Sequence, residues 1–204
     1  MNLDSEIRRL LDLMPASGRM NTKIVNKPQQ SKVLVTDFPY PWKRGNRPIY
    51  INFDLWKLLP AGARDLLLLR TISWLTGVKW FKPDLYQGIV LLGAVDGVIE
   101  LTQGDALGFL VAGGLGALAA SQIWQRNRSS QKDIDADEAA IKVAQRRGYS
   151  RTEAAANLLK AIEEVAKIEG RSSLSFSELI RTQNLRTIAN ISTVGVPKSV
   201  INDA

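Results

Sequence analysis

One long stretch of this chain carries no positive charge, and this stretch limits what the chain can fold into. Residues 83–125 contain no Lys or Arg, although the whole sequence contains 27. Within the stretch, residues 106–124 have only two polar side chains, Ser121 and Gln122. A helix over that range would be about as long as the ~30 Å hydrocarbon core of a bilayer is thick.

The stretch is interpreted as a transmembrane helical hairpin with arms at 85–101 and 106–124. The one charged side chain in the turn between the arms, 102–105, is the acid Asp105. Cations flank both outer ends: Lys79, Lys82, Arg126 and Arg128. This distribution predicts an integral membrane protein with its soluble parts on the cytoplasmic side. The alternatives are a hairpin buried in a soluble core, or a shallow hairpin that enters one leaflet.

Two features inside the hairpin are candidate sites. Small residues four apart predict helix-packing faces, because they let backbones approach closely in lipid. These residues are Gly93, Gly97, Gly108, Ala112, Gly116 and Ala120. Asp96 and Glu100 lie on one helix face and form a candidate intramembrane polar site, since charges in a bilayer are costly and often functional. The alternative is a pair of interfacial carboxylates reached by water.

The N-terminal part, residues 1–82, is predicted to be mixed helix and strand. An amphipathic helix is expected over 4–14, and strands over 32–36 and 48–53 that form a β-hairpin. A further helix is expected from Pro60 to about Trp74. The fold class is therefore α+β and mainly α-helical, with a small β-hairpin.

The C-terminal part, residues 126–191, is predicted to be entirely helical. One helix is expected over 133–146. Capping boxes at Ser150–Glu153 and Ser175–Glu178 predict the starts of two more, which run to about 169 and about 191. The tail, 192–204, is predicted to be irregular.

The composition excludes several kinds of chemistry. The sequence has no Cys and no His, so the usual zinc, haem and iron–sulfur ligands are absent, as is the commonest general base. No catalytic residue, metal ligand or cofactor is assigned. The net charge of +7 is compatible with an anionic membrane surface. Nucleic acid is not expected as a partner, because the cations follow no recognised binding motif.

The order of the parts resembles the HtpX and CAAX-prenyl-protease type of membrane zinc metallopeptidase. Residues 49–59 look like the strand and short helix of that family, and 60–69 look like the approach to its His-Glu-x-x-His motif. Asp133-Ile-Asp-Ala-Asp137, followed by Gly148-Tyr149, is similar to the helix that supplies its third zinc ligand. The resemblance implies a peptidase-like helical domain with an inserted membrane hairpin.

The chemistry of that family is missing from this chain. The zinc motif aligns with residues 70–74, Arg-Thr-Ile-Ser-Trp, so both His ligands and the catalytic Glu are lost. A catalytic zinc needs about three protein ligands. The resemblance thus implies a pseudopeptidase, whose degenerate zinc-site positions are Arg70, Thr71, Trp74, Asp133 and Asp137.

The whole chain is also similar to a cyanobacterial family of unknown function. The similar stretches are 11–19, 51–56, 136–141 and 145–149. This resemblance implies a photosynthetic host and a location in the thylakoid or plasma membrane. It implies no activity.

Arg70 gives the sharpest structural hypothesis. It lies in an apolar run, and a buried Arg requires an anionic partner. We expect an ion pair between Arg70 and Asp133 or Asp137; the alternative is an Arg70 side chain that faces solvent.

Three functions are compatible with these observations. The leading expectation is a non-catalytic, membrane-anchored scaffold that binds another membrane protein, as an assembly factor, accessory subunit or protease adaptor. The second is an enzyme that uses the carboxylates Asp133, Asp135 and Asp137. The third is a peripheral protein that binds membrane lipids through its basic flanks.

Overall fold

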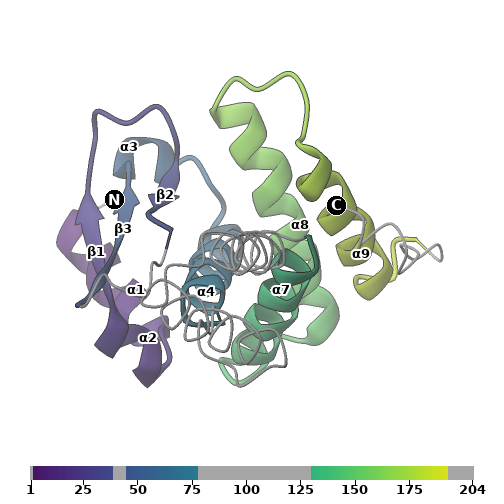
Figure 1. Ribbon diagram of the computed structural model, residues 1–204, viewed down its shortest axis with the longest axis horizontal. Helices are drawn as coiled ribbons and strands as arrows, with labels where there is room; N and C mark the ends of the chain where they lie inside the picture. Colours follow the sequence, from purple (N-terminus) through teal and green to yellow (C-terminus); the bar gives the residue numbers. More distant parts are fainter. Residues whose placement is uncertain (1, 39–44, 78–129, 193–204) are drawn as a thin grey trace, which may run out of the picture. The chain divides into compact units, whose positions relative to one another are not determined.

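The computed structural model describes residues 2–38, 45–77 and 130–192. The chain divides into two compact units, one formed by residues 1–78 with 130–204 and the other by 79–129. All of the described residues belong to the first unit. In Figure 1 the helix α4 (Ala61–Gly77) passes between a sheet-containing half and a purely helical half of the first unit.

The N-terminal half begins with two helices. Helix α1 (Leu3–Leu13) is capped by Asn2, whose side-chain oxygen accepts a hydrogen bond from the backbone N–H of Asp4 at 3.0 Å. Helix α2 (Ala16–Asn21) follows directly after Pro15. Gly18 lets α2 approach α4 closely, because a Cβ at this position would lie 2.8 Å from a methyl carbon of Ile72.

The sheet has three strands, in the order β1-β3-β2. Strand β3 (Arg47–Ile51) pairs antiparallel with β2 (Leu34–Thr36) and parallel with β1 (Thr22–Asn26). The predicted strands 32–36 and 48–53 are therefore paired, but as part of a mixed sheet. The prediction of a simple β-hairpin missed β1, whose short and half-exposed sequence gives little periodicity.

Two apolar clusters pack against opposite sides of α4. Leu68, Ile72 and Leu75 join a cluster made with α1, the sheet and the short helix α3 (Phe53–Trp56). Leu66 and Leu69 join a second cluster made with the C-terminal helices. The leucine run in α4 is thus explained by a helix that is buried on two sides.

The helical half contains α7 (Ser130–Gln145), α8 (Arg151–Ile168) and α9 (Phe176–Ile188). Both predicted capping boxes are present, at Ser150 with Glu153 and at Ser175 with Glu178. Helix α7 begins a few residues earlier than predicted, and α9 ends before the predicted boundary near 191.

The structure corrects the predicted fold class. The unit is mainly helical α+β, but among the described residues no helix is both long and apolar enough to cross a membrane. The longest described helix, α8, has 18 residues and carries charged side chains along much of its length. The fold class with an inserted transmembrane hairpin is therefore wrong for this structure. Residues 83–125, to which the hairpin was assigned, lie outside the described residues.

Candidate functional site

The side chain of Arg70 meets α7 inside the helical half of the unit. Its guanidinium forms an ion pair with Asp133, and its Nε lies 3.5 Å from Oδ1 of Asp137. The Arg70 side chain is only 18% exposed. The expected ion pair between Arg70 and the acids of α7 is thus present, and the alternative of a solvent-facing Arg70 is wrong.

Helix α9 completes the group from a third direction. Arg181 donates two hydrogen bonds to Asp137, from Nε at 2.8 Å and from a terminal nitrogen at 2.9 Å. Ser177, one turn earlier, donates its hydroxyl to Oδ2 of Asp133 at 2.6 Å. The Asp137 side chain is 0% exposed. We call Arg70, Asp133, Asp137 and Arg181 the three-helix cluster, because it joins α4, α7 and α9.

The charges of the three-helix cluster balance one another. Burial lowers the pKa of Arg70, and the nearby Arg181 lowers it further, whereas Asp137 and Asp133 raise it. Burial also acts to lower the pKa of Arg181, but Asp137 outweighs it, so that the pKa of Arg181 is raised. Both guanidinium groups stay charged at any ordinary pH. Two cations and two carboxylates therefore form a neutral group, whose parts would be costly to bury separately.

The remaining degenerate zinc-site positions do not join this cluster. The hydroxyl of Thr71 donates to the backbone carbonyl of Leu67 in its own helix at 2.8 Å. The ring of Trp74 packs edge-on against Phe38, with ring centroids 5.9 Å apart. Of the five positions, the structure brings together only Arg70, Asp133 and Asp137.

The carboxylates of the three-helix cluster are engaged by donors from the neighbouring helices. In the described stretches, no three His, Cys, Asp or Glu residues gather as a metal site would require. Both aspartates of the cluster accept hydrogen bonds from charged or hydroxyl donors. The third acid, Asp135, is exposed and accepts a hydrogen bond from Gln131 at 2.7 Å. The arrangement is therefore suited to holding helices together.

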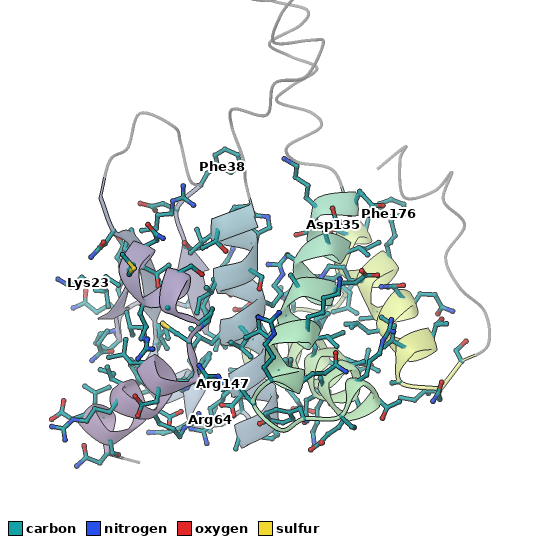
Figure 2. All side chains as sticks on the ribbon, turned by 90° about the horizontal axis from the view of Figure 1, so that it is seen from below. Lys23, Phe38, Arg64, Asp135, Arg147 and Phe176 are labelled. Carbon is teal, nitrogen blue, oxygen red and sulfur yellow. The ribbon has the colours of Figure 1, made fainter. Side chains whose placement is uncertain are left out.

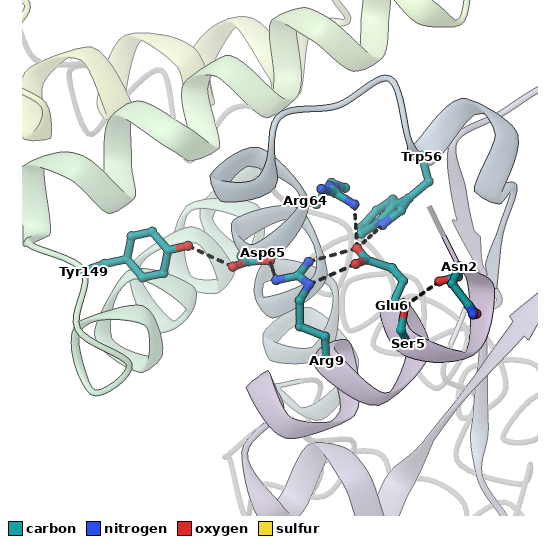
Figure 3. Close-up of polar contacts among 8 residues, drawn as sticks. All are labelled: Asn2, Ser5, Glu6, Arg9, Trp56, Arg64, Asp65 and Tyr149. Atoms are coloured by element: carbon teal, nitrogen blue, oxygen red, sulfur yellow. Dashed lines mark hydrogen bonds and ion pairs between the residues drawn. The ribbon is translucent and has the colours of Figure 1, made fainter.

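A second buried polar network was not predicted from the sequence. At its centre Glu6 of α1 accepts hydrogen bonds from Arg9 at 2.9 and 3.0 Å, from Trp56 at 3.1 Å and from Arg64 at 2.8 Å (Figure 3). Burial raises the pKa of Glu6, but the bonds from Arg9 and Trp56 outweigh this effect, so that the pKa is lowered. The carboxylate thus stays ionised at neutral pH.

The same network reaches the turn between α7 and α8. Arg9 donates a hydrogen bond to Asp65 at 2.5 Å, and the hydroxyl of Tyr149 donates to the other Asp65 oxygen at 2.8 Å. Burial and the bond to Asp65 raise the pKa of Tyr149 to about 12. The i,i+3 spacing of Glu6 and Arg9 was readable in the sequence, but nothing there linked them to residues of α4 or to Tyr149.

Several predicted sites lie outside the described residues. These are the polar pair Asp96 and Glu100 and the small-residue faces formed by Gly93, Gly97, Gly108, Ala112, Gly116 and Ala120.

Comparison with known proteins identifies the family to which the chain belongs. The model of DUF3318, described as a protein of unknown function, matches residues 8–149. The chain belongs to the DUF3318 family. This match covers most of the chain, including Arg70, Asp133 and Asp137. It ends before α9, so Ser177 and Arg181 lie outside the matched residues of this DUF3318 chain.

One relative of the DUF3318 chain comes from a cyanobacterium. It is the thylakoid membrane protein slr1949 of Synechocystis sp., which is 27% identical over 151 residues; the aligned region spans 72% of this chain and 69% of the relative. No solved structure matches the chain. These findings confirm the resemblance to a cyanobacterial family of unknown function. They give no support to the resemblance between the DUF3318 chain and the zinc metallopeptidases.

Proposed function

We infer that this protein is a non-catalytic scaffold that binds another protein at the thylakoid membrane. The observation that carries this inference is the three-helix cluster. Its carboxylates are engaged by Arg70, Arg181 and Ser177 and join helices that are far apart in the sequence. The membrane location rests on the name of the Synechocystis relative.

An enzyme that uses the α7 carboxylates is less well supported. A general acid or base must reach the proton that it transfers. Asp137 is fully buried between two guanidinium groups, and Asp133 is held by Arg70 and Ser177. Of the three aspartates, Asp135 is the exposed one. Among the described residues it belongs to no group of three acids that could hold a metal ion.

A double substitution can separate binding from carboxylate chemistry. Arg70→Met with Asp133→Leu replaces the ion pair by apolar side chains of similar length, an exchange that is often neutral for stability. The tagged full chain and this variant would be purified from mildly solubilised cyanobacterial membranes. A scaffold should retain the same stoichiometric partner in both cases, and the tagged partner should capture the chain in return.

The single variant Asp133→Asn is the matched comparison, because it removes the charge and keeps a hydrogen-bond acceptor for Ser177. We expect any loss of partner binding by Asp133→Asn to match its loss of folded protein. If the well-folded double variant instead loses all function in cells while Asp135→Asn keeps it, the scaffold proposal is wrong and a catalytic Asp133 is favoured.

A further inference from the structure

The end of α7 and the turn that leads into α8 carry a group of exposed positive charges. Residues 142–151 contain four cations and no acid. The cations are Lys142, Arg146, Arg147 and Arg151, and all four residues are exposed. Lys142, Arg146 and Arg151 form no ion pair with any residue that the structure describes. Their charges are therefore open to an anionic partner.

The turn itself is fixed to two neighbouring helices. Arg147 donates a hydrogen bond to the backbone carbonyl of Met14, at the end of α1, at 3.0 Å. The hydroxyl of Tyr149 donates to Asp65 of α4 at 2.8 Å (Figure 3). Between them Gly148 has a φ of +95°, a left-handed conformation that favours glycine. The cations thus stand on a fixed backbone, so that little ordering entropy is lost when a partner binds.

The positive charge of the turn is not cancelled by its surroundings. The Glu6 network that Tyr149 joins is neutral in itself, because its two carboxylates are matched by two guanidinium groups. The first acids on either side of the turn are Glu138 and Glu153, so that residues 138–153 hold four cations against two acids. Glu153 is already engaged by the backbone N–H that begins its own capping box, at 3.4 Å.

The surroundings of the turn favour a polar partner over a bilayer. Of the large apolar side chains that are exposed in the described ranges, none belongs to residues 142–151. In Figure 2, Arg147 lies well away from Phe176, one of these exposed apolar residues. Surfaces that settle into a bilayer combine cations with apolar side chains that enter the interface. Guanidinium groups without such neighbours are suited to pairing with carboxylates, which they can bind with two parallel hydrogen bonds.

We propose that the α7–α8 turn binds a carboxylate-rich surface of the partner protein through Arg146, Arg147 and Arg151. The proposal rests on the scaffold function proposed above and adds the surface that makes the contact and the chemistry of the partner. The contact is electrostatic, so it weakens as salt is added.

A short fluorescent oligoglutamate peptide can test the turn, because it supplies carboxylates without the partner. The test variant of the full chain is Arg146→Glu/Arg151→Glu; Arg147 is kept because it holds α1. The matched control is Lys23→Glu/Lys32→Glu, which changes the net charge equally at two other exposed residues. Lys23 lies well away from Arg147 in Figure 2. Circular dichroism would show that each chain is folded, and Arg146→Gln/Arg151→Gln would replace a test variant that is not.

Binding would be measured by fluorescence anisotropy at physiological ionic strength, where charges more than about 8 Å apart are largely screened. We expect the wild type and the control to bind the peptide with similar affinity, and the test variant to bind at least about tenfold more weakly. Added salt should weaken the binding of the wild type. Flotation with phosphatidylglycerol vesicles, which represent the lipid alternative, should be the same for the wild type and the test variant.

Two results would overturn the proposal. One is a control that loses as much affinity for the peptide as the test variant, because binding would then follow net charge alone. The other is a wild type that binds the vesicles through Arg146 and Arg151 and does not bind the peptide, which would make the turn a lipid contact. Neither result affects the scaffold function, which fails only if the tagged chain recovers no stoichiometric partner from solubilised membranes.

Discussion

At the scale of single residues, the buried carboxylate of Asp137 contacts the guanidinium groups of two arginines. Asp137 accepts two hydrogen bonds from Arg181 and lies 3.5 Å from Nε of Arg70. Asp135, two residues away on the same helix, points to solvent. Two aspartates on the same helix thus differ in environment, one buried and one exposed, which makes them a matched pair for substitution.

We predict that Asp137→Asn strongly destabilises the protein. The amide cannot neutralise two buried guanidinium groups, and breaking a buried ion pair in this way typically costs about 3–5 kcal/mol. Asp135→Asn should change the free energy of unfolding by no more than about 0.5 kcal/mol. Urea unfolding followed by circular dichroism measures both. Equal stability of the two variants would show that the three-helix cluster does not hold the fold.

The sequence predicted part of this cluster and not the rest. Arg70 in an apolar run indicated a buried cation, and Asp133 and Asp137 lie four apart, so both can face one partner. The role of Arg181 was not predicted. The sequence of α9 indicates only a capped helix, and the packing of α9 against α7 is a long-range contact that a local pattern does not indicate. The Glu6 network was missed for the same reason, since its members come from three separate segments.

At the scale of elements, α9 is fixed at its first turn by more than its capping box. Glu178 accepts hydrogen bonds from Arg171 at 2.7 and 2.9 Å and from the backbone N–H of Ser175 at 2.8 Å. Arg171 also pairs with Glu169, whose carboxylate accepts from the backbone N–H of Val33 at 3.0 Å. A chain of polar contacts therefore ties the start of α9 to the segment before β2.

This arrangement predicts a loss of stability in acid. Burial raises the pKa of Glu178, but the bonds from Arg171 and Ser175 outweigh it and lower the pKa to about 2. Because the folded-state pKa lies below the ordinary value of 4.5, the stabilisation is complete above pH 4.5 and is lost as the pH falls toward 2. Its size is on the order of 2 kcal/mol.

The variant Glu178→Gln isolates this effect. Its melting temperature should lie below that of the wild type at neutral pH, and the gap should close between pH 4.5 and 2. Thermal melts across this range measure the gap. A gap that stays constant down to pH 2 would mean that the Glu178 charge does not stabilise α9.

At the scale of the whole molecule, α4 connects the two halves of the described unit. Its two apolar sides pack on different clusters, and its polar residues Arg64, Asp65 and Arg70 enter both buried networks. Sequence patterns predicted the C-terminal helices and the capping boxes well, because these signals are local. The pairing of β1 with β3 and the two-sided burial of α4 are long-range and left no comparable signal.

We propose that this unit acts by binding a protein at the membrane, and that the three-helix cluster holds its shape. Native electrophoresis of mildly solubilised cyanobacterial membranes, with the full chain and its variants tagged, tests this claim most directly. We predict that the wild type and Asp135→Asn migrate in one assembly with a second protein, and that Asp137→Asn is lost from it. Migration of the folded wild-type chain by itself, with no second protein, would contradict the account.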